Sequence, residues 1–305
     1  MGTPDFAVSS LRILLEHHHS IVAVVTAPDK PRGRGQEITF SPIKQFALEN
    51  ALPILQPQDL KDPVFVSSAR TLQPDLIVVV AFRILPKELY SIPKQGAFNL
   101  HASLLPKYRG AAPINWAIIN GETETGVTTF FLQEKVDTGS LILQARVKIG
   151  VDETAGELHD KLAAVGAEIV LQTVHLIELG KVNLRSQNDS HATPAPKIFK
   201  DDCRINWNNP SVSVHNFVRG LSPYPCAWTT HAGKVLKIYR TQLSRSVDVG
   251  SKSSGTIVDV GKKSLYVAAK GETISILEIQ QEGKKRMGVE EFLRGYSLHE
   301  DDKFA

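Results

Sequence analysis

Two polar side chains end an apolar stretch in the first half of the chain, and both could stabilise a developing negative charge. Asn99 and His101 are two residues apart at the end of residues 97–101. If this stretch is a β-strand, both side chains project from the same face of it. An amide N–H and an imidazole can donate hydrogen bonds to an oxygen that gains charge during a reaction. Taken alone, the pair is explained equally well as a strand end that happens to be polar.

A carboxylate that could join this pair lies further along the sequence, in Val136-Asp137-Thr138-Gly139. Apolar and β-branched runs at 126–132 and 141–147 predict a hairpin with Asp137 on its connection. A carboxylate beside His101 would fix the ring and stabilise its charged form. It could also help to move a proton between two nitrogen atoms. A plain turn residue is the alternative explanation for Asp137.

The elements that must position these residues alternate between helix and strand. Helical periodicity is present at 4–18, 42–50, 62–72 and 154–179, and apolar runs at 21–25 and 75–81 are typical of buried strands. The order predicts an α/β domain, whose ligands bind beyond the carboxyl ends of the strands. The loop 82–86 and the Asn99/His101 pair both follow strands, so we expect them to form opposite walls of one pocket. No G-x-G-x-x-G follows a strand, which argues against a dinucleotide dehydrogenase.

Composition limits the class of protein. The chain has 305 residues, enough for two domains, and 42% hydrophobic with 22% charged residues is typical of a soluble protein. The apolar run 76–82 is too short to span a bilayer, and no leader pattern opens the sequence, so we expect a cytoplasmic protein without a membrane partner. Cys203 and Cys226 form no metal motif and indicate no disulfide framework.

Positive charge is concentrated in two places. Residues 206–286 contain twelve basic and five acidic residues, a net charge of +7 within a chain whose net charge is +3. The short runs at 227–230, 235–241, 255–260, 265–269 and 273–280 predict a small β-barrel in this region, after a helix at 212–221. Loop 26–41 carries Lys30, Arg32 and Arg34. Both places could bind a polyanion, although a solvated basic face is an equally good explanation of the charge alone.

Several motifs together carry a family resemblance. In chain order they are Gly2-Thr3-Pro4-Asp5-Phe6, Pro28-Asp29 with Gly33-Arg34-Gly35, Asn99-Leu100-His101, Ser103-Leu104-Leu105-Pro106, Tyr108-Arg109-Gly110-Ala111-Ala112-Pro113 and Val136-Asp137-Thr138-Gly139. This set resembles the methionyl-tRNA formyltransferases, the tRNA-directed branch of the 10-formyltetrahydrofolate transferase superfamily. The resemblance implies a Rossmann-like formyltransferase domain with a mostly parallel sheet at 1–180, a linker at 181–205 and an OB-like tRNA-binding domain at 206–305.

The resemblance also implies a reaction and the residues that serve it. The formyl group of 10-formyltetrahydrofolate would pass to the amino group of methionyl initiator tRNA, without a metal, and Asn99, His101 and Asp137 would be catalytic. Folate would contact a larger set of residues: Phe82, Arg83, Ile84, Leu85, Ser103, Leu104, Leu105, Pro106 and Val136. The tRNA would contact Lys30, Arg32 and Arg34 at its acceptor end, with Arg34 making the specific contact. Its phosphates would meet Lys234, Lys237 and Arg240.

The sequence departs from the family pattern at two positions. Family members have a central strand directly before Gly-Thr-Pro-Asp-Phe, whereas Met1 takes the last place of that strand here, so we expect the native protein to start upstream. Phe82-Arg83 replaces the usual Tyr-Gly, although related purine-pathway formyltransferases often have Arg-Ile-Leu there.

The partners expected are the tRNA and folate, without DNA, on a monomeric protein. Two alternatives stay open: a formyltransferase acting on a sugar amine or a nucleotide precursor, and a non-catalytic RNA-binding module. The complete Asn99, His101 and Asp137 set argues against the module.

Overall fold

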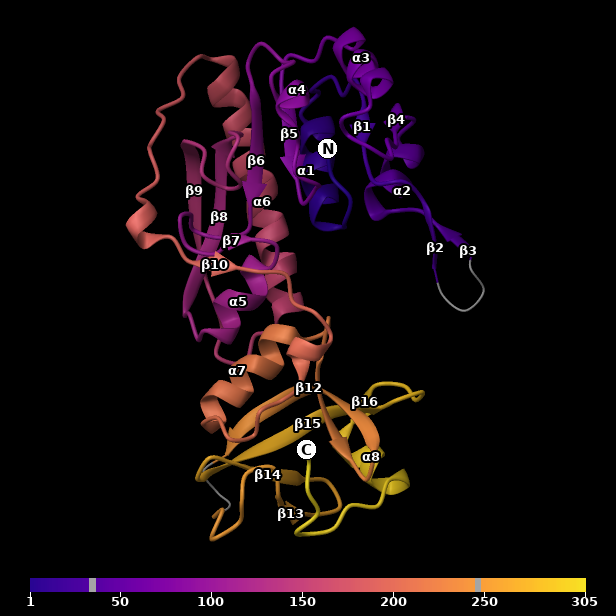
Figure 1. Ribbon diagram of the computed structural model, residues 1–305, viewed down its shortest axis with the longest axis vertical. Helices are drawn as coiled ribbons and strands as arrows, with labels where there is room; N and C mark the ends of the chain where they lie inside the picture. The colour runs from indigo at the N-terminus through magenta and orange to yellow at the C-terminus, as the bar shows by residue number, and fades with distance from the viewer. Residues whose placement is uncertain (33–36, 245–247) are drawn as a thin grey trace. The chain divides into compact units, whose positions relative to one another are not determined.

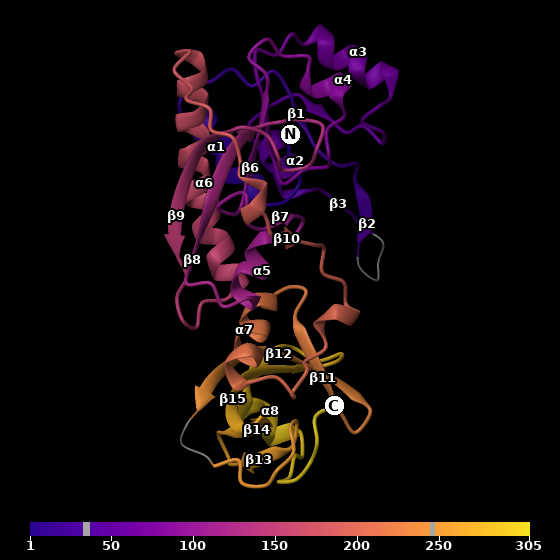
Figure 2. The same ribbon diagram turned by 60° about the vertical axis from the view of Figure 1, so that its left-hand side comes forward.

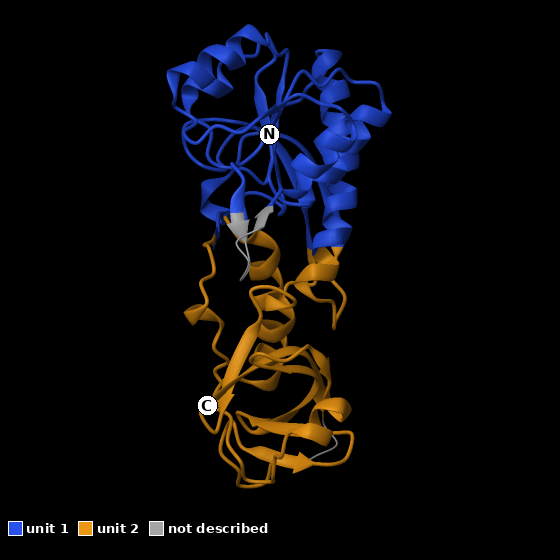
Figure 3. Ribbon diagram, turned by 90° about the vertical axis from the view of Figure 1, so that its right-hand side faces the viewer, with its two compact units in different colours: residues 1–110, 125–147, 159–194 blue, residues 111–124, 148–158, 195–305 orange. Residues whose placement is uncertain are grey.

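The chain divides into two compact units (Figure 3), and each has its own hydrophobic core. The computed structural model describes residues 1–32, 37–244 and 248–305. Unit 1 comprises residues 1–110, 125–147 and 159–194, and unit 2 comprises residues 111–124, 148–158 and 195–305. Short segments from the first half of the chain therefore belong to the second unit. Within the described residues, no helix is both long enough and apolar enough to span a membrane.

A Rossmann-like sheet organises unit 1 (Figure 1). Its strands are β1 (Val24–Val25), β4 (Ile54–Leu55), β5 (Ile77–Val80), β6 (Ala97–His101), β8 (Glu124–Phe131) and β9 (Leu141–Lys148). The pairs β1–β4 and β5–β6 are parallel, β8 is antiparallel to β6, and β9 lies beside β8. The strands β1 and β5 are joined by the first two residues, because the Gly2 amide donates to Val25 and the Val80 amide donates to the carbonyl of Met1.

The helices of unit 1 begin where the sequence supplies capping groups. They are α1 (Phe6–Glu16), α2 (Pro42–Glu49), α3 (Pro63–Thr71), α4 (Lys87–Tyr90) and most of α6 (Ala155–Glu178). Ser41 and Asp62 accept hydrogen bonds from amides in the first turns of α2 and α3, and each is followed by a proline suited to that turn. Helix α1 is shorter than the expected 4–18, because Asp5 caps it and His18 adopts a positive φ of 61°.

Helix α6 covers one face of the sheet (Figures 1 and 2). A Cβ at Gly166 would lie 2.8 Å from Leu100 of β6, so glycine permits the close approach of this helix to that strand. Thr129 of β8 and Thr173 of α6 also share a hydrogen bond of 2.8 Å. The expectation of a long helix at 154–179 is confirmed, and this helix holds β6 in place from behind.

Of two expectations for residues 21–41, one is confirmed in part and one was wrong. The buried parallel strand expected at 21–25 is present but shorter, as β1, whose partner β4 is itself two residues long. The segment 26–41, expected as a loop, contains the antiparallel strands β2 (Lys30–Arg32) and β3 (Glu37–Thr39). Pro31 lacks an N–H but is tolerated at the edge of a two-stranded ribbon. Hydrophobic patterning gave no sign of this hairpin, because it contributes almost no apolar side chains.

Unit 2 is built around a curved antiparallel sheet. Its elements are α5 (Pro113–Ile119), α7 (Ser211–Leu221), β11 (Ala227–His231), β12 (Lys234–Ser244), β13 (Ile257–Val260), β14 (Leu265–Ala269), β15 (Glu272–Gln281), β16 (Met287–Gly288) and α8 (Val289–Gly295). The strand order is β11-β12-β15-β14-β13, with β16 paired to β15. The core includes Leu236, Ile238, Ile257, Leu265 and Ile276, all fully buried.

The C-terminal segment joins the two outer strands of this sheet. Ala305 and Thr230 exchange backbone hydrogen bonds of 2.9 Å, and Phe304 donates to the carbonyl of Gly255 at 2.8 Å. Ile257 of β13 in turn donates to Asp302 at 2.8 Å. The sheet therefore curves round this segment in a barrel-like form, in agreement with the predicted class of the second domain.

Candidate active site

His101 ends β6 with its ring buried and oriented by a backbone carbonyl. Its side chain is 6% exposed, and Nε2 lies 2.8 Å from the carbonyl oxygen of Tyr108. A carbonyl can only accept, so Nε2 carries the hydrogen and donates it. Nδ1 then faces Oδ2 of Asp137 at 3.8 Å. The Tyr108 carbonyl orients the imidazole, and the Asp137 carboxylate lies on the side of its other nitrogen.

Asp137 lies on the connection between β8 and β9, as expected, and is held there by backbone groups. Its side chain is 10% exposed, and its Oδ2 accepts a hydrogen bond of 2.9 Å from the Gly110 amide. The backbone has a φ of 55°, a left-handed conformation that Asp tolerates better than most residues. Gly139 is required nearby, because a Cβ there would lie 1.7 Å from the carbonyl oxygen of Phe131.

Two residues that the sequence analysis did not select brace this connection. Gln187 donates to the carbonyls of Asp137 and Gly139 at 2.8 and 2.9 Å. Arg109 donates from Nη2 to Oε1 of Gln187 at 2.7 Å and also pairs with Asp189. Arg109 is part of a recognised motif, but Gln187 belongs to a segment without periodicity, so no local pattern could have revealed its role.

Asn99 is the polar residue of the site whose side chain makes no hydrogen bond within the described residues. It lies opposite Val79 and Phe130 in the sheet and is half-buried. Among the residues that the structure describes, its side-chain amide has no hydrogen-bond partner. By strand alternation it shares a face of β6 with His101. A half-buried amide without a partner is available to a ligand.

The predicted contacts of Ser103–Pro106 with folate stay predictions. In the structure, part of this loop packs against the protein interior. Ser103 is fully buried and donates to the carbonyl of Lys107 at 2.6 Å. Leu105 is 3% exposed, and its amide donates to Oγ1 of Thr128. Leu104 and Pro106 are half-buried. The loop therefore supports the site through its backbone, and its hydroxyl and leucine side chains face the protein interior.

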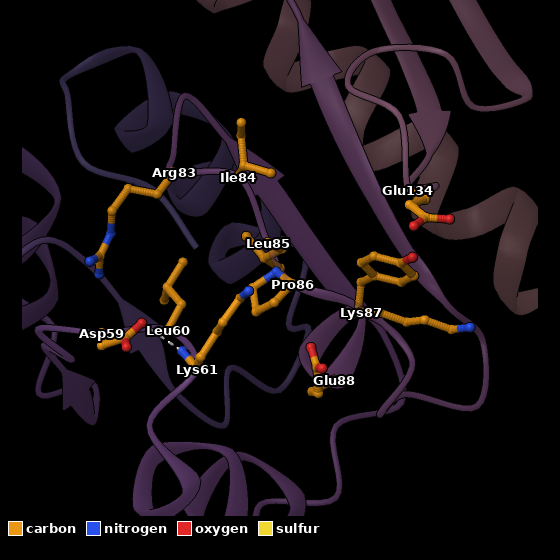
Figure 4. A pocket seen from close by; sticks show the side chains of 11 residues that line it. Asp59, Leu60, Lys61, Arg83, Ile84, Leu85, Pro86, Lys87, Glu88 and Glu134 are labelled. Carbon is orange, nitrogen blue, oxygen red and sulfur yellow. Dashed lines mark hydrogen bonds between the residues drawn. The ribbon is translucent and has the colours of Figure 1, made fainter.

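A pocket of about 490 Å³ lies beside the loop that follows β5 (Figure 4). It brings together the predicted residues Arg83, Ile84 and Leu85 with Glu134 from the β8–β9 connection. The rest of its lining is Asp59, Leu60, Lys61, Pro86, Lys87, Glu88 and Tyr90. Glu134 brings the β8–β9 connection to the same pocket as loop 82–86. Asn99, His101 and Asp137 are not part of its lining, so this pocket does not have loop 82–86 and the Asn99/His101 pair as its opposite walls, as the sequence analysis expected.

The side chains predicted to contact folate differ in their availability. The guanidinium of Arg83 donates at 2.8 Å to the carbonyls of Pro57 and Gln58, so it ties the loop to a neighbouring segment. Phe82 lies under this guanidinium, with 5.2 Å from its ring centre to the Arg83 carbon. Ile84 and Val136 are exposed, by 73% and 49%. The two exposed side chains are the ones free to meet a flat ligand.

The residues predicted to contact tRNA lie on two different strand systems. Lys30 is exposed at the start of β2, Arg32 ends that strand, and Arg34 lies outside the described residues. In unit 2, β12 bulges between Ile238 and Thr241. The bulge changes the alternation of the strand, so that Lys237 and Arg240 both point away from the core.

The three predicted contacts on β12 differ in their partners. Lys234 is exposed, with its nitrogen 5.6 Å from the ring centre of Tyr296. Lys237 is half-buried. Arg240 is paired with the carboxylates of Glu157 and Glu278. A phosphate would therefore have to compete with two carboxylates at Arg240, whereas Lys234 has no carboxylate partner among the described residues.

An α/β sheet that ends in an Asn/His pair, with an Asp from the following hairpin beside it, is typical of a group-transfer enzyme. The chain belongs to the formyl transferase family: the model of that family matches residues 1–174, and the model described as formyl transferase, C-terminal domain, matches residues 197–297. Similar chains include proteins named methionyl-tRNA formyltransferase from Bacteroides thetaiotaomicron and Flavobacterium johnsoniae. The first is 49% identical over 99% of this chain and 96% of its own length, and the second is 46% identical over 99% and 97%.

Solved structures show the same fold at low identity. The sugar 3N-formyl transferase WlaRD, crystallised with dTDP and 5-N-formyl-THF, has a TM-score of 0.67 at 22% identity, over 93% of this chain and 97% of its own. HypX from Aquifex aeolicus, in complex with tetrahydrofolic acid, has a TM-score of 0.61 at 18% identity, over 85% of this chain and 47% of its own. Folate is therefore present in solved structures of this fold.

Proposed function

We propose that the protein transfers the formyl group of 10-formyltetrahydrofolate to the amino group of methionyl initiator tRNA. The observation that carries the proposal is the side-chain amide of Asn99, which has no partner among the described residues. It lies on the same strand face as His101, whose ring faces Asp137 at 3.8 Å. The full-length similarity to proteins named methionyl-tRNA formyltransferase supports the choice of acceptor. The pocket at loops 82–86 and 133–139 supports a place for the flat ring of folate.

The reaction requires stabilisation of one oxygen and movement of one proton. The methionyl nitrogen attacks the formyl carbon, the new C–N bond forms, and the carbonyl oxygen gains negative charge. Asn99 donates from its side-chain amide to this oxygen, a contribution of the kind that is worth about a hundredfold or more in rate. The bond from the formyl carbon to N10 then breaks, and the proton lost by the attacking amine passes to N10.

His101 and Asp137 serve the proton transfer. Since Nε2 of His101 is used by the Tyr108 carbonyl, Nδ1 is the nitrogen directed to the reacting groups and to Asp137. The Gly110 amide donates to Oδ2 of Asp137, and within the described residues no backbone amide donates to its other carboxylate oxygen. A carboxylate and an imidazole placed together can pass a proton from the amine to the leaving nitrogen through water.

Formyl transfer to four acceptors tests this function. Methionyl initiator tRNA, methionyl elongator tRNA, free methionine and an amino sugar nucleotide are each supplied with 10-formyltetrahydrofolate, and product is measured by mass spectrometry. We expect turnover with the initiator tRNA and little or none with the other three. Transfer to an amino sugar nucleotide instead of any tRNA would favour the sugar-amine alternative and exclude this one. Binding of tRNA without any transfer would favour the RNA-binding alternative.

A single substitution separates the tRNA contacts from the folate contacts. Arg34→Ala removes the cation that we assign to the acceptor end of the tRNA, so kcat/KM for the tRNA should fall at least tenfold while KM for folate stays within twofold. Lys181→Ala, which removes an exposed lysine from unit 1, is the control and should change neither value. An equal loss of kcat/KM for the tRNA and for folate would contradict the assignment of Arg34.

A further inference from the structure

Three possible metal ligands lie together in unit 1, and none of them is among the residues assigned to formyl transfer. We propose that His19, His175 and Glu178 bind a divalent transition-metal ion of the zinc class. Each residue offers one ligand atom, and these atoms lie within 4.8 Å of one another. The proposal departs from the expectation of a chain without metal, which rested on the chemistry of formyl transfer and on the spacing of the cysteines.

The two elements that carry the ligands are held by backbone hydrogen bonds. His19 follows α1, and its amide donates to the carbonyl of Leu14 at 3.0 Å. His175 and Glu178 are three residues apart in the last turns of α6, a spacing that places them on one side of the helix. The amide of Leu179 donates to His175 at 3.1 Å, so the last turn is intact. The three donors are therefore preorganised by two helix ends.

The separation of the donors suits one small cation. Nδ1 of His19 lies 3.3 Å from Oε1 of Glu178. Two ligands that each lie about 2.0–2.1 Å from a tetrahedral zinc ion are about 3.4 Å apart. The rings of His19 and His175 have centres 5.6 Å apart and are tilted by 42°, so they are not stacked face to face.

The hydrogen bonding of His19 is incomplete without a further partner. Nε2 of His19 is buried and has no hydrogen-bond partner within the described part of the chain. The ion pair with Glu178 uses Nδ1 and leaves Nε2 unsatisfied, a costly arrangement for a buried polar atom. A half-turn of the ring exchanges the two nitrogens. Either nitrogen can therefore face an ion bound beside Glu178, while the other takes the buried position.

The donor set selects the class of metal. Two imidazoles and one carboxylate are ligands that zinc, cobalt and nickel accept, whereas magnesium and calcium prefer oxygen ligands alone. His175 and Glu178 are exposed, so an ion can enter from solvent and keep a water molecule as its fourth ligand. The ion would link the end of α1 to the end of α6 and stabilise the folded chain.

Metal binding to the full chain tests the proposal directly. Zinc is titrated into metal-free protein by calorimetry, with one equivalent expected to bind. His19→Gln, His175→Gln and Glu178→Gln should each weaken binding at least tenfold. His299→Gln, which replaces an exposed histidine of unit 2, should leave the dissociation constant within twofold of the unaltered chain. Far-UV circular dichroism without metal checks that each variant is folded. If a histidine variant does not fold, the Glu178→Gln variant, whose substitution is at an exposed position, provides the test.

X-ray absorption at the zinc edge gives an independent readout. The loaded protein should show nitrogen and oxygen ligands at about 2.0–2.1 Å with the scattering pattern of two imidazoles. Sulfur ligands at about 2.3 Å would place the ion at a cysteine and overturn the proposal. Absence of saturable binding, or equal affinity in the unaltered chain and the three ligand variants, would overturn it as well.

Discussion

Nδ1 of His101 lies 3.8 Å from Oδ2 of Asp137, although His101 ends β6 and Asp137 lies on the connection between β8 and β9. The register of β6 and β8 pairs Phe98 with Phe131, so β8 ends beside the beginning of β6. Residues 132–137 must therefore run back along β6 before Asp137 can reach His101. The bonds from Gln187 to the carbonyls of Asp137 and Gly139 hold this returning segment. The site thus depends on a fold-back that a simple hairpin would not make.

Replacing Asp137 by Asn tests the contribution of its charge. Asparagine retains an oxygen for the Gly110 amide, so the connection should keep its position while the carboxylate is lost. We expect kcat to fall about a hundredfold, with KM for both substrates within twofold, because the group acts on the proton transfer. Steady-state kinetics with both substrates varied measures the two effects. Asp160→Asn, at a carboxylate that is 84% exposed, is the control. A rise in KM with kcat unchanged would assign Asp137 to binding instead.

Replacing Asn99 by Ala tests the donor to the formyl oxygen. Since the amide of Asn99 has no partner in the described residues, its loss should change the free energy of unfolding by less than about 1 kcal/mol. The same change should lower kcat about 10²–10³-fold. Asn115→Ala should give the opposite pattern, because the amide of Asn115 donates to the Gly220 carbonyl at 2.7 Å and lies outside the proposed site. Unfolding in urea and single-turnover rates distinguish the two variants. An equal loss of the free energy of unfolding in both would contradict the finding that the Asn99 amide has no partner in the described residues.

The sequence predicted the strand that carries the site better than the contacts that orient it. Residues 97–101 are apolar apart from the functional pair, and the strand formed where this pattern indicated. The partners of His101 and Asp137 include the Tyr108 carbonyl and the Gly110 amide. Backbone groups have the same chemistry at every residue, so only the path of the chain selects them. The bulge in β12 that turns Arg240 outward has no distinct residue type either.

Gly139→Ala should damage both the fold and the site. The added Cβ would lie 1.7 Å from the Phe131 carbonyl oxygen, so the backbone must move. Overpacking of this kind costs about 1–3 kcal/mol, and a displaced Asp137 should lower kcat at least tenfold. Gly295→Ala is the matched control, since a Cβ there meets nothing within 4 Å, and its stability should stay within about 0.5 kcal/mol of the unaltered chain. Thermal unfolding followed by kinetics at low temperature measures both. Normal kcat in a folded Gly139→Ala protein would show that the connection tolerates the shift.

His215 should make unit 2 less stable as the pH falls. Burial lowers the pKa of His215 below its ordinary value and Arg219 acts in the same direction, while the Val151 carbonyl and Asp152 oppose the shift. The unfolded chain then binds a proton at His215 below about pH 6.5 that the folded chain does not bind, so stability is lost as the pH falls through this value.

His215→Gln isolates this effect. Glutamine can keep contacts with Thr241 and Val151 but does not titrate, so the variant should be less stable at pH 8 and should lose less stability than the unaltered chain between pH 7.5 and 5.5. The measurement is the urea midpoint followed by tryptophan fluorescence, because Trp116, Trp207 and Trp228 all lie in unit 2. Equal slopes of the urea midpoint against pH in the two proteins would mean that His215 takes up its proton without unfolding. The burial of its ring would then not govern the acid sensitivity of unit 2.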